Sequence, residues 1–291
     1  MKHIIPILFI LMILPSCTKS AEDRTIPFEG IENARDLGGL KVAGGKTIKP
    51  AMLIRSGHLG AATDADVALL KERFALSDVF DFRFDAEAGA DPDRVIEGVN
   101  NTRLSTLPQA FIGGFSSGRA DTVETKASDF VAKLVQYSFN PRAQELGRRM
   151  YPAIVMDPTS QKRYGEFLRG VLSAKGGVLW HCSQGKDRAG WATAFVLAAL
   201  GADRRTIVDD FNLSNVSYAS AVEKLSEQVT EMGGGENELS FIRSMIGVSV
   251  ENFESALDII DESYGSMDAY LEKALGFGPE DRAALRKKLC K

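Results

Sequence analysis

HCSQGKDRAG, residues 181–190, is the stretch of this 291-residue chain that decides its fold. The apolar run Gly177–Trp180 precedes it, and the longer apolar run Trp191–Leu200 follows it. This order predicts a buried strand, a tight loop and a buried helix. A loop that leads into a helix presents unpaired backbone N–H groups at the positive end of the helix dipole. We therefore expect the loop to bind an anion.

Two side chains of the stretch add chemistry to this anion site. The guanidinium of Arg188 is a planar fork that matches two oxygens of a phosphate group. Cys182 lies at the base of the loop, and we expect its thiol to be ionised at neutral pH. A thiolate beside a phosphate-binding loop predicts hydrolysis of phosphate esters with Cys182 as the nucleophile. The nucleotide-binding motif Gly-x4-Gly-Lys-Ser/Thr does not fit, because Trp180 and Asp187 replace its first Gly and its Ser or Thr.

The stretch resembles the signature loop of the bacterial tyrosine phosphatases related to the secreted mycobacterial and listerial enzymes. Further segments resemble this family in the family's own order from about residue 25 to about residue 275. They are Asn33–Gly39, Leu53–Leu59, Asp81–Arg83 with Glu87, and Asp210–Phe211 with Leu213–Asn215. The resemblance implies a phosphatase of phosphotyrosine, of other phosphoproteins and of phosphoinositides that works through a phosphocysteine intermediate.

The resemblance also implies roles for individual residues. Asp187 matches the position of the family's general acid, with Asp81 and Asp93 as alternative acids. Arg188 is the catalytic arginine, and the remaining loop positions bind phosphate: Ser183, Gln184, Gly185, Lys186, Ala189 and Gly190. We expect His181, before the nucleophile, to orient the loop or tune the thiolate. Arg35, Asp36 and Arg83 are expected to support the site.

Ala189 departs from the family, which usually has Thr or Ser after the arginine. The hydroxyl at that position can stabilise the cysteine thiolate as it leaves the phosphocysteine, so we expect slow turnover of the intermediate. Two alternatives stay open. One is a phosphatase of inositol phosphates or phosphoinositides, with which the charge of Lys186 is compatible. The other is a phosphate-binding pseudophosphatase, which only Ala189 favours.

Composition narrows the class of protein. A hydrophobic content of 44% suits one sizeable domain, which we expect to span residues 28–291. The net charge of −4 gives no reason to expect nucleic-acid binding. His58 and His181 lack the spacing of a metal site, and we expect neither a metal nor a cofactor. The predicted fold is α/β, with a central, mostly parallel sheet flanked by helices, as in cysteine phosphatases, and a helical C-terminal part.

Local patterns place the elements around the loop. Thr63 and Asp66 form a capping box that predicts a helix start. Further predictions are strands at Val79–Phe84 and Asn101–Leu107, a helix from Thr159 to before Gly176, and a helix break at Gly233–Gly235. Residues 111–150 match no family motif. They read either as a lid over the site or as an ordinary surface excursion.

The N-terminus predicts export. The apolar run from Ile4 to Pro15 follows a short basic start and is shorter than the roughly 20 residues of a membrane span. Leu14–Cys17 resembles a bacterial lipoprotein box. We expect residues 1–16 to be a signal peptide, Cys17 to be lipidated, and residues 17–27 to tether the domain to a membrane, on the periplasmic or cell-surface side. The alternative is a plain secretory peptide. The expected partners are the membrane, through this lipid, and a phosphorylated protein or small phosphoester.

Overall fold

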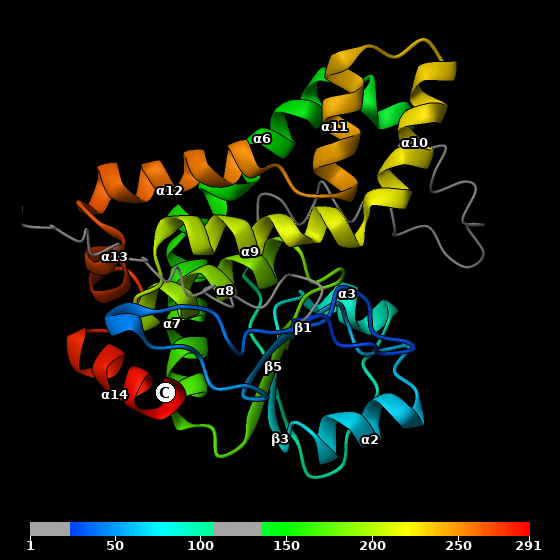
Figure 1. The fold of residues 1–291 in the computed structure, drawn as a ribbon. Coiled ribbons are helices and arrows are strands. Elements are labelled where there is room, and N and C mark those ends of the chain that lie inside the picture. The colour runs from blue at the N-terminus through cyan, green and yellow to red at the C-terminus, as the bar shows by residue number, and fades with distance from the viewer. Residues whose placement is uncertain (1–23, 107–134) are drawn as a thin grey trace, which may run out of the picture.

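A computed structural model describes residues 24–106 and 135–291, and its centre is one sheet (Figure 1). The strands are β1 (Arg35–Asp36), β2 (Leu53–Ser56), β3 (Leu76–Asp81), β4 (Asn100–Arg103) and β5 (Gly177–His181). Their order across the sheet is β1-β2-β5-β3-β4. All neighbours are parallel except β1 and β2, which are antiparallel. The predicted α/β fold is confirmed.

The central strands are buried on both faces. Successive side chains of a strand point to opposite sides of the sheet, and each side meets its own hydrophobic core. In β5, Val178 and Trp180 join the larger core, while Leu179 joins the smaller one. Phe80 and Val79 of β3 divide between the two cores in the same way. The sheet therefore lies between two layers, and β5 is held at its centre.

Helices form these layers and the C-terminal part (Figure 1). Up to the catalytic stretch they are α2 (Asp64–Glu72), α3 (Asp85–Ala90), α6 (Pro141–Met156) and α7 (Pro158–Ser173), with the short η1 (Ala43–Gly45). After it come α8 (Asp187–Leu200), α9 (Arg204–Ser217), α10 (Ala219–Glu231), α11 (Glu236–Ile246), α12 (Val250–Tyr264), α13 (Met267–Lys273) and α14 (Pro279–Leu289). Helix α8 is buried from Ala189 to Leu200, since α7, α9, α13 and α14 surround it.

Most of the local predictions hold, with shifted ends. The Thr63–Asp66 capping box begins α2, and the glycines at 233–235 separate α10 from α11. The first predicted strand begins three residues earlier than expected and ends at Asp81, not at Phe84. It ends there because the backbone N–H of Arg83 donates to the Asp81 carboxylate (2.9 Å) and turns the chain out of the sheet.

The predicted tether was wrong at its C-terminal end. Arg24 and Ile26 are buried, Thr25 pairs with Arg35, and the Ile26 N–H donates to the Ala34 carbonyl (3.0 Å). Residues 24–27 are therefore part of the folded domain, which begins before the expected boundary at residue 28. Residues 1–23, with the signal peptide and Cys17, lie outside the described residues.

The region 111–150 is described only from residue 135 onwards, so most of the expected lid lies outside the described residues. In the described part, Val135 is buried in a third small core with residues of α10 and α11. Helix α6 begins at Pro141 and packs against α7 and α12. No helix in the described ranges is long and apolar enough to span a membrane.

Candidate active site

The site begins at the C-terminal end of β5, where ligands of open α/β sheets gather. The strand ends at His181, and Cys182 follows with only 2% of its surface exposed. The chain then turns through residues 183–186 and enters α8 at Asp187. The predicted strand, loop and helix are therefore present, and the helix starts four residues earlier than its apolar run.

The loop carbonyl groups all face away from the loop's interior. Each accepts a hydrogen bond from outside the loop. The Ser183 carbonyl accepts from the His58 N–H (3.1 Å), and the Gln184 carbonyl accepts from the side chains of Asn33 (3.1 Å) and Tyr218 (2.8 Å). The carbonyls of Gly185 (2.6 Å) and Lys186 (3.0 Å) both accept from the Arg55 guanidinium. In a trans peptide the N–H points opposite to the C=O. The N–H groups of residues 184–187 are thereby turned to the other side, where they form a cradle for an anion.

Gly185 is required by this turn. Its φ of 68° lies in the left-handed region. A Cβ at this position would lie 2.2 Å from the carbonyl oxygen of Ser56. The loop can follow its path against β2 only with glycine here.

Arg188 is fixed by Glu87, which lies in the first turn of α3. Both terminal nitrogens of the guanidinium donate to the carboxylate, at 2.6 and 2.8 Å, and the Ser183 hydroxyl donates to the same carboxylate at 2.7 Å. Burial would raise the pKa of Glu87, but the Arg188 hydrogen bonds and charge outweigh it and lower the pKa. The guanidinium is therefore held at the mouth of the loop before any ligand binds.

Asp187 is the first residue of α8, and its carboxylate accepts a hydrogen bond from the phenol of Tyr151 (2.6 Å). An alternative interpretation of this carboxylate is a structural ion pair with Arg188 or Arg35. Neither pair forms, because Arg188 binds Glu87 and Arg35 binds Asp210. Its side chain is 18% exposed, so the carboxylate is partly accessible from outside the protein.

Lys186 forms hydrogen bonds outside the loop. Its ammonium group donates to the carbonyl groups of Met245, Ile246 (3.1 Å) and Gly247 (2.9 Å), at the C-terminal end of α11. It also lies 3.9 Å from the Asp187 carboxylate. Burial lowers the pKa of Lys186, opposed by the charges of Asp187 and Cys182. This lysine ties the loop to α11 as well as adding charge beside it.

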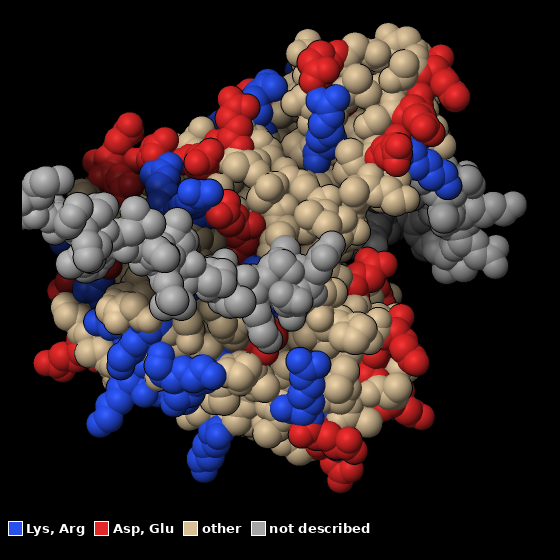
Figure 2. Space-filling model, in the orientation of Figure 1, with Lys and Arg blue, Asp and Glu red and all other residues tan. Residues whose placement is uncertain are grey.

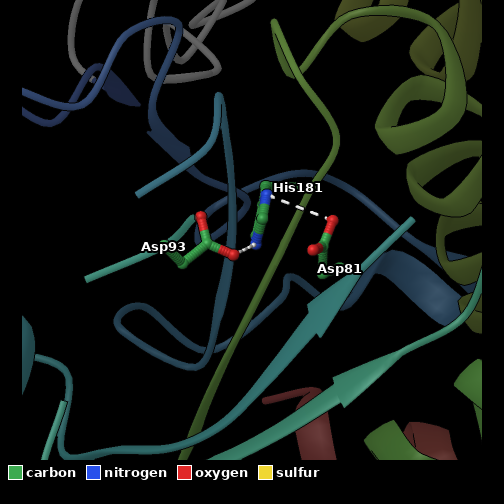
Figure 3. A group of neighbouring side chains, drawn as sticks. All are labelled: Asp81, Asp93 and His181. Atoms are coloured by element: carbon green, nitrogen blue, oxygen red, sulfur yellow. Dashed lines mark ion pairs between the residues drawn. The ribbon is translucent and has the colours of Figure 1, made fainter. Parts of the chain in front are cut away.

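His181 lies between two carboxylates (Figure 3). Its Nε2 is 3.3 Å from Asp93, its Nδ1 is 3.8 Å from Asp81, and Nδ1 is also 3.1 Å from the Cys182 carbonyl oxygen. Burial raises the pKa of Asp93, but hydrogen bonding and charge from His181, with the Leu59 N–H and Arg83, lower it to about 2. This environment opposes the protonated state that a general acid needs.

These three residues also have the spacing of a metal site, since one ligand atom from each lies within 4.8 Å of the others. The guanidinium of Arg83 already supplies positive charge there. It binds both oxygens of Asp81 at 3.0 Å and one of Asp93 at 2.7 Å. That the protein binds no metal stays a prediction.

A second buried network supports the loop from the opposite side. Asp210 of α9 is completely buried and binds Arg24 (2.9 Å), Arg55 (3.2 Å) and Arg35 (3.3 Å). Burial raises the pKa of Asp210, but the three guanidinium charges hold it far below its usual range. Arg55 carries this support to the loop, because it donates to the loop carbonyls named above.

The two remaining expectations concern Asp36 and Ala189. Asp36 accepts from the N–H groups of Gly38 and Ala51, both at 2.8 Å, so it supports the turn beyond β1 and not the loop directly. Ala189 is fully buried. The family's hydroxyl at this position is absent, and the hydroxyl of Ser183, in the same loop, donates to Glu87.

The sequence predicts no role for three partners of the site. Glu87 and Asp210 enter only as parts of segments that resemble the family, and Tyr151 lies in no motif. They come from three helices, α3, α9 and α6, none of which carries the loop. The signal for Glu87 was its place in the family-like segment, in the first turn after a strand that ends beside β5.

Comparison with known proteins agrees with the motifs. A model described as the tyrosine phosphatase family matches residues 26–291. The triple specificity protein phosphatase PtpB of Mycobacterium tuberculosis is 30% identical over 264 residues, which cover 84% of this chain and 92% of that protein. A Cupriavidus necator protein named "Putative tyrosine-protein phosphatase" is 28% identical over 253 residues, or 86% and 84% of the two chains.

Proposed function

Since the chain belongs to the tyrosine phosphatase family and is a phosphatase of that type, we propose that it hydrolyses phosphate monoesters through a phosphocysteine at Cys182. The observation that carries the mechanism is the outward pairing of the loop carbonyls above Cys182. It directs consecutive N–H groups toward the place where phosphate oxygens must lie. Charge that develops on these oxygens meets fixed donors, with Arg188 as the charged one.

In the first step the Cys182 sulfur attacks phosphorus, and the bond from phosphorus to the leaving oxygen breaks. Asp187 gives that oxygen a proton, which requires the protonated carboxyl group. In the second step the Asp187 carboxylate takes a proton from water, and the hydroxide oxygen attacks phosphorus. The sulfur leaves as thiolate, and inorganic phosphate is released.

The environments of the carboxylates support Asp187 as the acid over the alternatives. Asp187 keeps partial exposure beside Arg188. Asp81 is fully buried and bound by the Arg83 guanidinium. The lowered pKa of Asp93 favours the ionised form of that carboxylate. We assign both to the support of His181 and Arg83.

For substrates we propose broad specificity for phosphorylated proteins, because the mycobacterial relative carries the name triple specificity protein phosphatase. Phosphoinositides stay an alternative that the Lys186 charge is compatible with. Phosphate release should be measured on phosphotyrosine, phosphoserine, inositol phosphates and phosphoinositides. Cys182→Ser should lose the activity on each substrate, whereas Cys290→Ser, which changes the other described cysteine, should keep it. Phosphate binding without release by the wild type would instead favour a pseudophosphatase.

We also propose that the protein is an exported lipoprotein attached to a membrane through Cys17. The support comes from the sequence alone, from the apolar run and the Leu14–Cys17 box. The wild type should enter the detergent phase of a Triton X-114 extraction, and Cys17→Ser should remain in the aqueous phase. Equal partition of the two proteins would contradict the anchor.

A further inference from the structure

We propose that Tyr151 positions the general acid: its phenol fixes which oxygen of Asp187 carries the proton to the leaving group. The inference rests on the proposed role of Asp187 as acid. Tyr151 lies on α6, outside every motif of the sequence, and 36 positions separate it from Asp187. Its hydroxyl and the carboxylate are 2.6 Å apart, at the short end of the range for hydrogen bonds to charged oxygens.

The direction of this hydrogen bond follows from the chemistry of the two groups. An ionised carboxylate only accepts hydrogen bonds, so the phenol donates its proton to Oδ1 of Asp187. Burial, reinforced by the Asp187 charge, keeps the pKa of Tyr151 well above its usual value, so the group stays protonated in the working range of pH.

A carboxyl group that accepts at Oδ1 carries its proton on Oδ2. Tyr151 thus directs the proton away from itself, and Oδ2 is the oxygen on the side of the Lys186 ammonium (3.9 Å). The phenol also limits rotation of the carboxyl group, which matters because small displacements of a reacting group lower rates steeply. Tyr151 acts through Asp187, and we assign it a positioning role.

The surroundings make Tyr151 rigid enough for this task. It is 2% exposed, and its ring meets Phe211, Trp191 and Phe253 edge to face, with centroids 5.7, 6.2 and 6.5 Å away. These rings come from α9, α8 and α12, so the phenol is held by three helices at once.

The test compares Tyr151→Phe with wild type on a series of aryl phosphates of rising leaving-group pKa. We expect kcat/KM on poor leaving groups, which reports the step that forms the phosphocysteine, to fall about tenfold, as for loss of one hydrogen bond to a charged group. On the best leaving groups kcat/KM should change little. Tyr270→Phe is the matched control, because it removes another buried phenol that donates to α6, at the Val155 carbonyl (2.6 Å), away from the loop.

Asp187→Asn makes the result specific. In that background Tyr151→Phe should cause no further loss of kcat/KM on poor leaving groups, because there is no proton left to direct. Asp187→Glu keeps a carboxyl group but moves it out of register with the phenol, and should show the same sensitivity to the leaving group. It serves if Tyr151→Phe does not fold.

Four outcomes overturn the inference. A loss equal on all leaving groups, or additive with Asp187→Asn, assigns Tyr151 a purely structural role. Wild-type rates for Asp187→Glu on poor leaving groups show that the position set by Tyr151 is unimportant. If Asp187→Asn itself has no leaving-group dependence, the proposed acid fails and this inference with it, whereas the Cys182→Ser experiment would still stand.

Discussion

Asp93 offers a measurable test of how the base of the loop is held. Its side chain is 7% exposed and accepts hydrogen bonds from Arg83 and from the Leu59 N–H, both at 2.7 Å. These partners and His181 lower its pKa from 3.8 to about 2. Since one pKa unit corresponds to about 1.4 kcal/mol, the ionised carboxylate stabilises the fold by about 2 kcal/mol at neutral pH. We expect Asp93→Asn to lose about this free energy of unfolding.

The dependence on pH follows from the sign of the shift. A carboxyl group whose folded pKa is depressed contributes its full stability above the unfolded pKa, near 4, and loses it as the pH falls through the folded pKa, near 2. The difference between wild type and Asp93→Asn should therefore be complete at pH 7 and about half as large at pH 3. Urea unfolding can be followed by fluorescence, because Trp180 and Trp191 are both fully buried.

Asp91→Asn is the control from the same loop. Asp91 is half exposed, and among the described residues its carboxylate forms an ion pair only with His58. This substitution should change stability far less. A difference between wild type and Asp93→Asn that is absent at pH 7, or the same at pH 3 and pH 7, refutes the reasoning. A kcat/KM that falls selectively on poor leaving groups in Asp93→Asn would instead restore Asp93 as an acid.

Two further predictions concern Asp210 and Ala189. Asp210→Asn leaves three buried guanidinium groups without their carboxylate, so we expect the free energy of unfolding in urea to fall by roughly 3–5 kcal/mol. Phosphate binding should also weaken, because Arg55 releases the loop. A fall below about 1 kcal/mol would contradict the role of the network. Ala189→Ser adds the hydroxyl that the family usually has at this position. In stopped-flow assays the ratio of the burst rate to the steady-state rate should fall about tenfold. An unchanged ratio means that the hydroxyl is not needed here.

The catalytic stretch was predictable because its signal is local. Strand, loop and helix follow one another within residues 177–200, so apolar runs and one glycine suffice to predict them. The groups that hold the stretch were not predictable in this way. Glu87 lies 101 positions from Arg188 and Tyr151 lies 36 from Asp187, and only the packing of helices brings them together.

At the N-terminus the sequence instead predicts a tether for residues that are folded. Arg24 is charged, and charged residues near a terminus usually indicate solvated chain. Its guanidinium is nevertheless buried, because Asp210 from α9 pairs with it across 186 positions. A charge can enter the core when a partner compensates it, and composition alone does not reveal the partner.

The separation of the two described cysteines has a consequence for oxidation. Cys290 pairs with Ile48, and the neighbouring Lys288 binds the carbonyl of Ala174, ahead of the first residue of β5. Cys182 follows the last residue of β5. The five residues of this extended strand, about 16 Å long, therefore separate Cys182 from the end of the strand near Cys290. A disulfide needs Cα atoms within about 7 Å. A sulfenic acid formed on Cys182 has no partner thiol among the described residues, and an exogenous thiol would have to return it to the reduced, active form.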